Sequence, residues 1–177
     1  MIHIQSPVAN WLDAVAQLPA GYPVKAVDGV QLLAQAKARN PAIRTILRHW
    51  YDPGQLFGGS WQANLDRARQ FFATFIDGTF IQLAAAVDLV EEWNEYNATG
   101  HSPAERAERE RWAQAAAEVW YTEYKSRPEL AHIHLVIGNV AVGNDIFPGQ
   151  AEAAAHYGAY VGYHAYWLVR NHTVPSP

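Results

Sequence analysis

Residues 87–97 read VDLVEEWNEYN, a short apolar run that passes directly into charged, aromatic and amide side chains. This pattern is typical of a buried strand that ends at a polar edge. A helical pattern over residues 61–85, with a break near Asp77-Gly78, comes before it. After it, Ser102, Pro103 and Glu105 follow the order of a helix N-terminus, with a cap, a proline and a capping-box carboxylate. We therefore expect a strand at 87–93 between two helices.

The same alternation of short apolar strands and longer helical stretches extends along the whole chain, which favours βα units and a parallel sheet. We predict an α/β fold of the parallel (β/α) barrel-like kind, formed by one domain over residues 1–170 and followed by an unstructured tail at 171–177. The other strands are expected at 2–5, 23–28, 43–50, 132–137 and 161–167, and the helices at 8–18, 29–39, 61–85, 102–126 and 149–159. These are about six βα units, whereas an eight-unit barrel takes about 250 residues.

Composition excludes several classes of function. The chain has 177 residues, of which 50% are hydrophobic, and a formal net charge of -4, so clustered phosphate contacts to nucleic acid are not expected. It has no cysteine, which excludes disulfides and thiolate chemistry. We find no signal peptide at the start and no run of about 18 apolar residues that could cross a membrane. The sequence therefore predicts a soluble protein that binds neither nucleic acid nor membrane, in a compartment that it does not define.

Polar and aromatic side chains gather where the predicted strands end. The third strand is followed by Trp50 and Asp52, the fourth by Glu95, and the last ends near His164 and Tyr166. Because the carboxyl ends of parallel strands share one edge, these groups are expected to lie together. Cleavage of a glycosidic bond needs a carboxyl group that protonates the leaving oxygen, and sugar rings pack on aromatic faces. This edge therefore predicts a carbohydrate site.

The segment Glu91-Glu92-Trp93-Asn94-Glu95, at the end of a fourth strand, resembles the Asn-Glu motif of clan A glycoside hydrolases, which have the TIM-barrel fold. The resemblance implies that Glu95 is the acid/base carboxylate and that Asn94 contacts the substrate. The end of the last strand, from Tyr163 to Tyr166, resembles the His/Tyr end of strand six in that clan. The expected substrate-binding residues are Asn94, Trp93, Tyr96, His164, Tyr166, Trp50 and Asp52, and no metal or other cofactor is expected.

The sequence departs from the clan in one respect. The clan's nucleophile is a Glu on strand seven, and this sequence has no counterpart of it. Three interpretations stay open: the chain is a truncated relative, another carboxylate such as Asp52 or Asp145 substitutes, or hydrolysis is absent. In the last case we expect a non-catalytic carbohydrate-binding or assembly protein. An incomplete barrel also has open sheet edges, which predicts a homo-oligomer.

Two further groups of residues have alternative interpretations. Glu91 and Glu92 should point to opposite faces of their strand, and each could pair with an arginine such as Arg44 or Arg48. His132 and His134 should share one face of the fifth strand. A His-x-His pair can bind a metal, and a metal-dependent hydrolase is therefore a further alternative. Hydrogen-bonded histidines in the core or at an interface are the ordinary outcome.

Overall fold

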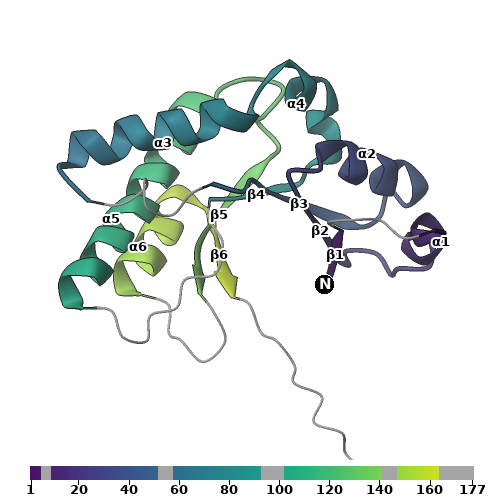
Figure 1. Cartoon of the computed structure of the whole chain (residues 1–177), viewed down its shortest axis with the longest axis horizontal. Helices are drawn as coiled ribbons and strands as arrows, with labels where there is room; N and C mark the ends of the chain where they lie inside the picture. The colour runs from purple at the N-terminus through teal and green to yellow at the C-terminus, as the bar shows by residue number, and fades with distance from the viewer. Residues whose placement is uncertain (5–8, 52–57, 93–101, 141–146, 164–177) are drawn as a thin grey trace, which may run out of the picture.

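The computed structural model describes residues 1–4, 9–51, 58–92, 102–140 and 147–163. These residues form a six-stranded parallel sheet whose strands lie in sequence order (Figure 1). The strands are β1 (Ile2–Ile4), β2 (Pro23–Val27), β3 (Arg44–Arg48), β4 (Leu89–Glu91), β5 (His134–Val140) and β6 (Tyr160–Tyr163). The predicted α/β class with a parallel sheet is thereby confirmed.

Helices separate consecutive strands. They are α1 (Trp11–Ala16), α2 (Val30–Arg39), α3 (Trp61–Phe75), α4 (Gly78–Leu83), the 3₁₀ turn η2 (Ala84–Ala86), α5 (Pro103–Val119), the π-helical turn η3 (Trp120–Tyr124) and α6 (Pro148–Tyr157). None of these described helices is both long enough and apolar enough to cross a bilayer.

Local capping explains where two of the helices begin. Ser102 and Glu105 form a capping box at the start of α5, with Pro103 in its first turn. The Asp77 side chain accepts a hydrogen bond from the Phe80 backbone N–H, so it caps α4 and separates this helix from α3. The sequence predicted the capping box at Ser102 and a break near Asp77-Gly78, but not the capping role of Asp77.

The helices cover one face of the sheet. A sequential order of parallel strands places every right-handed crossover on the same side. The main core accordingly joins helix residues to alternate strand residues such as Val24, Leu47, Val90 and Leu135. The opposite face has a separate small cluster of three strand residues, Ile46, Leu89 and Val136. We call these two sides the helix face and the open face of the sheet.

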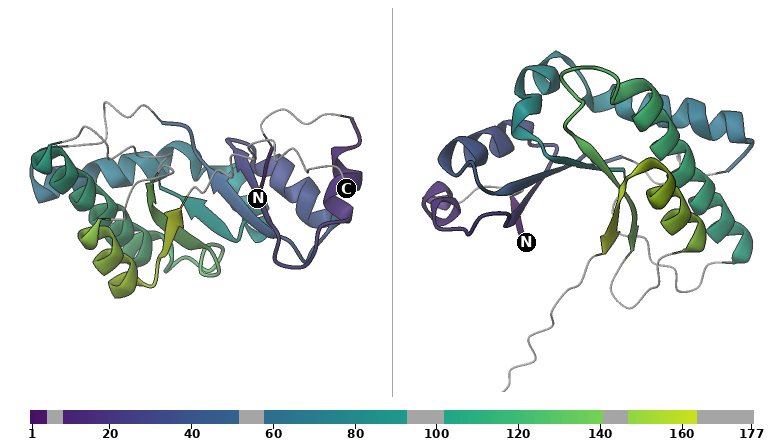
Figure 2. Two further views of the ribbon diagram at one scale, coloured as in Figure 1. Left: turned by 90° about the horizontal axis from the view of Figure 1, so that it is seen from below. Right: turned by 180° about the vertical axis from the view of Figure 1, so that it is seen from behind.

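The connection from β3 to β4 consists of two helices with different neighbours. Helix α3 packs against α5, whereas α4 and η2 pack against α2. Figures 1 and 2 show α3, α5 and α6 over one half of the sheet and α1, α2 and α4 over the other. The end of α3 therefore comes close to the carboxyl end of β3, where His49 contacts Phe75.

Candidate functional site

The carboxyl edge of the sheet holds several polar side chains among the described residues. Asp28 follows β2, His49 and Trp50 follow β3, and Glu91 and Glu92 end or follow β4. Alternation along the strands divides these groups between the two faces. The edge therefore contains one polar group on the open face and two on the helix face.

On the open face, Lys25 of β2 and Glu91 of β4 form a buried ion pair that spans β3. The Nζ to Oε2 distance is 2.5 Å, and the side chains are only 0% and 4% exposed. Glu91 was expected to pair with an arginine on the neighbouring strand, such as Arg44 or Arg48. The structure shows an ion pair with a lysine two strands away, and Arg48 lies directly beside Glu91 in the register of β3 with β4. In a buried ion pair of this kind, the attraction between the two charges offsets the free-energy cost of removing them from water.

On the helix face, Glu92 is buried against α5 and β5. Its Oε1 accepts the Gly138 backbone N–H at 3.0 Å, and its Oε2 accepts the Trp112 indole N–H. Burial raises the pKa of the Glu92 carboxyl from 4.5 to about 7, although both donors and the charge of Arg109 act in the opposite direction. Glu91 and Glu92 thus point to opposite faces as expected, but Glu92 is held by N–H donors of Gly138 and Trp112 and not by an arginine ion pair.

Asp28 and His49 form the second group on the helix face. The His49 Nδ1 lies 2.5 Å from Asp28 Oδ1, and the same oxygen accepts the Trp50 backbone N–H at 3.0 Å. Asp28 has a φ of 53°, an uncommon left-handed conformation for a residue other than glycine. The His49 ring packs 5.0 Å from that of Phe75 between centroids. The carboxylate therefore fixes the orientation of the imidazole.

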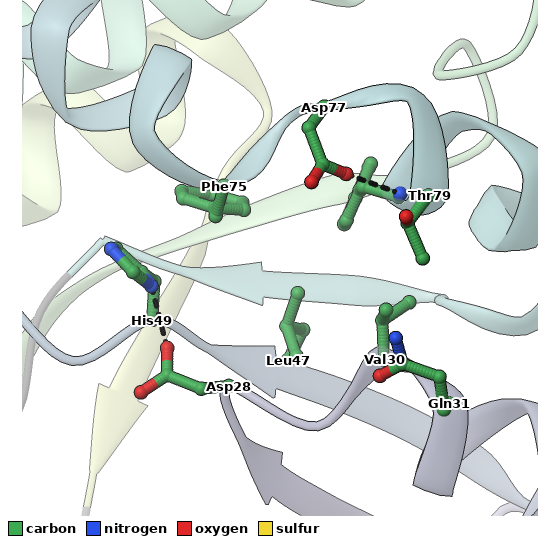
Figure 3. A pocket seen from close by; sticks show the side chains of 9 residues that line it. Asp28, Val30, Gln31, Leu47, His49, Phe75, Asp77 and Thr79 are labelled. Carbon is green, nitrogen blue, oxygen red and sulfur yellow. Dashed lines mark hydrogen bonds and ion pairs between the residues drawn. The ribbon is translucent and has the colours of Figure 1, made fainter.

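A cavity of about 240 Å³ lies beside this pair, between the ends of β2 and β3 and the start of α4 (Figure 3). Its lining combines a mostly apolar wall with carboxylate, amide, hydroxyl and imidazole groups, and it includes neither Lys nor Arg. The lining residues are Asp28, Val30, Gln31, Leu47, His49, Phe75, Asp77, Thr79 and Phe80.

Of the site residues predicted from the sequence, the structure describes Trp50. Trp50 is 65% exposed and lies two residues beyond β3. The other predicted site residues lie outside the described residues, and their roles stay predictions. They are Glu95, Asn94, Trp93, Tyr96, Asp52, His164 and Tyr166, together with the alternative carboxylate Asp145.

The two histidines considered as metal ligands have other surroundings. The His132 Nε2 lies 3.1 Å from the Ala84 carbonyl oxygen, and the His134 ring packs edge-on against Tyr160. Burial and the nearby Lys125 lower the pKa of His134. Across the described part of the chain, no group of three His, Asp or Glu side chains could hold a metal ion. The metal-dependent alternative therefore gains no support from these residues.

Three features of this edge were not predicted as contacts: the Lys25 ion pair, the donors to Glu92, and the bond between Asp28 and His49. The one signal in the sequence was Lys25, a charged residue in the middle of an apolar strand. A lysine that is buried at such a position needs a partner of opposite charge.

No family model matches the chain, and no curated protein sequence matches it significantly.

Proposed function

We propose that the protein is a glycoside hydrolase-type enzyme that cleaves O-glycosidic bonds of a β-linked oligo- or polysaccharide, with Glu95 as the acid/base carboxylate. The observation that supports this most is the position of β4. Its last residue, Glu91, lies at the carboxyl edge of an interior strand with β3 and β5 on either side. Glu95 follows four residues later, and catalytic groups of (β/α) enzymes come from this edge.

The chemistry of the edge is consistent with a sugar substrate. In this proposal Asn94 holds a sugar hydroxyl, and the exposed Trp50 provides a flat apolar surface for the C–H face of a ring. Trp93, Tyr96, Asp52, His164 and Tyr166 complete the substrate-binding set. The second carboxylate that glycosidases require would be Asp52, Asp145 or a residue of another copy of the chain.

The proposal also concerns the kind of α/β fold to which the parallel sheet belongs. Within the described residues, β1 and β6 each pair with one neighbouring strand, so both are sheet edges. We propose that the sheet is an incomplete TIM-barrel-like unit and that a second copy covers these edges in a homo-oligomer. A sedimentation mass equal to one chain would contradict the oligomer without affecting the assignment of Glu95.

A hydrolysis screen over β-linked glycans, with wild type and Glu95→Gln side by side, tests the enzymatic assignment. We expect Glu95→Gln to lower kcat by about 10²- to 10⁴-fold, because the amide cannot donate the acid proton. Glu129→Gln is the control, since Glu129 is exposed and lies before the amino end of β5. It should retain wild-type turnover.

The outcomes of this screen separate the proposed enzyme from the alternative. Equal hydrolysis by wild type and Glu95→Gln would refute the acid/base role. Sugar binding by both proteins without turnover in either would replace the enzyme with a non-catalytic carbohydrate-binding protein. Isothermal titration against the same glycans measures that binding.

A further inference from the structure

The cavity between the ends of β2 and β3 and the start of α4 has an apolar floor and a polar rim. Val30, Leu47 and Phe80 belong to the main core and are at most 8% exposed, so their side chains close the cavity toward the interior. The carboxylate, amide and hydroxyl residues of the lining are exposed to solvent: Asp28, Gln31, Asp77 and Thr79. This arrangement suits a ligand with an apolar body and a polar end that stays in contact with water.

The rim has two carboxylates, which come from different elements. Asp28 follows β2 and Asp77 caps α4, and Figure 3 shows them on two sides of the cavity. Asp28 uses its Oδ1 for His49 and for the Trp50 backbone N–H. Asp77 uses its Oδ1 for the Phe80 backbone N–H at 2.8 Å. Among the described residues, no donor reaches the Oδ2 of either carboxylate, so each retains an acceptor for a ligand.

The charge of this lining is negative in either protonation state of His49. Two carboxylates are balanced by at most one imidazolium, since the lining includes neither Lys nor Arg. The cations of β2 and α2 are each paired with a carboxylate elsewhere: Lys25 with Glu91, Lys37 with Asp88 and Arg39 with Asp13. The first turn of α2 adds about half a positive charge, which the two carboxylates outweigh. The cavity therefore favours a cation over an anion.

The lining suits an organic cation better than a metal ion. Calcium requires about six to eight oxygen ligands, and magnesium requires a nearly octahedral set. Across the described ranges, no three His, Asp or Glu side chains come close enough to hold either ion. The wall includes the partly buried Phe75, and an aromatic ring attracts an ammonium group that lies over its face. The volume of about 240 Å³ is below the range of about 300–1,000 Å³ that is usual for drug-sized ligands, so the ligand is small.

We propose that this cavity binds a small organic cation, a primary ammonium compound with a short apolar chain. The chain lies on the floor formed by Val30, Leu47 and Phe80, and the ammonium group lies at the rim, where an Oδ2 atom accepts its N–H. Because the rim is exposed, the ammonium group keeps part of its hydration, and the cost of its desolvation is small. The inference goes beyond the proposed function and does not rest on it, because it involves neither Glu95 nor a glycan.

Amide ¹H–¹⁵N titrations with hexylammonium, hexanol and hexanoate test the inference, because these three probes share a chain and differ in charge. We expect hexylammonium to shift the signals of residues 28–31 and 77–80 with a Kd of about 1 mM or tighter. Hexanol should bind about 3-fold more weakly, since it lacks the attraction of the carboxylates, and hexanoate should bind most weakly of all. Butylammonium should bind about 5- to 15-fold more weakly than hexylammonium, because it buries two methylenes fewer.

The double variant Asp28→Asn/Asp77→Asn removes both charges and keeps the local backbone. Asparagine tolerates the left-handed conformation of residue 28, whose φ is 53°, and it caps a helix as well as aspartate does. This variant should bind hexylammonium about 10-fold more weakly and hexanol as wild type does. Asp13→Asn is the matched control, since the Asp13 side chain is 67% exposed on α1 and does not line the cavity. It should bind both probes as wild type does.

Several results would overturn the inference. Equal affinity for hexylammonium and hexanol would mean that the cavity recognises only the apolar chain, and tighter binding of hexanoate would indicate an anion site. Unchanged affinity for hexylammonium in the double variant, or no shift with about 10 mM hexylammonium, would also contradict it. Shifts of the same signals by Mg²⁺ or Ca²⁺ alone would replace the organic cation with a metal ion.

The probe series on wild type decides the question by itself if the double variant does not fold. None of these measurements depends on glycan hydrolysis, so a failure of this inference and a failure of the proposed function are distinguishable.

Discussion

Replacing Lys25 with methionine is expected to lower the free energy of unfolding by about 3–5 kcal/mol. The substitution removes a cation that is 0% exposed and takes the Lys25 ammonium away from the Glu91 carboxylate, which is 4% exposed. Urea unfolding at pH 7 measures the loss. An exposed ion pair provides the comparison: Arg39 lies 3.4 Å from Asp13 with both side chains more than half exposed. Arg39→Met should cost at most about 1 kcal/mol.

The double variant Lys25→Met/Glu91→Leu separates the ion pair from the packing around it. Because both charges are replaced by apolar groups of similar size, most of the stability lost in Lys25→Met should return. A double variant as unstable as the single one would show that steric fit at residue 25, and not the uncompensated charge, determines the loss. A Lys25→Met loss no larger than that of Arg39→Met would contradict the buried ion pair itself.

The stability of wild type should fall with rising pH between about 4.5 and 7 because of Glu92. Burial raises the pKa of its carboxyl to about 7 in the folded state, from an ordinary value of 4.5. Below this window the group is protonated in both states. Within it, the unfolded chain releases the proton while the folded chain retains it, so unfolding becomes more favourable as pH rises. The difference between these two pKa values corresponds to a loss of about 3 kcal/mol in the free energy of unfolding. This loss is complete once the pH exceeds the folded-state pKa.

Urea unfolding of wild type and Glu92→Gln at pH 4.5, 5.5, 6.5 and 7.5 measures this effect, with the pH values chosen to bracket about 4.5 and 7. The amide does not titrate, so the stability of wild type relative to Glu92→Gln should fall by about 3 kcal/mol across the series. Glu110→Gln replaces a carboxylate of α5 that accepts the Gly149 backbone N–H, and its stability should follow that of wild type in parallel. A difference between wild type and Glu92→Gln that is independent of pH would mean that Glu92 ionises in the folded protein as readily as in the unfolded chain.

Much of the architecture follows from local patterns in the sequence. All six strands were predicted, although the expected strand residues 5, 93 and 164–167 lie outside the described residues, and the break near Asp77-Gly78 is the boundary between α3 and α4. The capping box at Ser102 also formed as expected. These features were predictable because side-chain periodicity and helix caps act between residues close in the chain. The Glu95 assignment depends on a motif resemblance and stays a prediction.

Local patterns of side chains were sufficient to predict a parallel α/β sheet, the order of its elements along the chain and the opposite directions of Glu91 and Glu92. The groups that meet became apparent only in the folded chain: Lys25 with Glu91 across β3, Glu92 with Gly138 and Trp112, and Asp28 with His49. Local patterns specify the face to which a side chain points. The choice among partners on that face depends on strand register and on how the helices pack, which involve residues far apart in the chain.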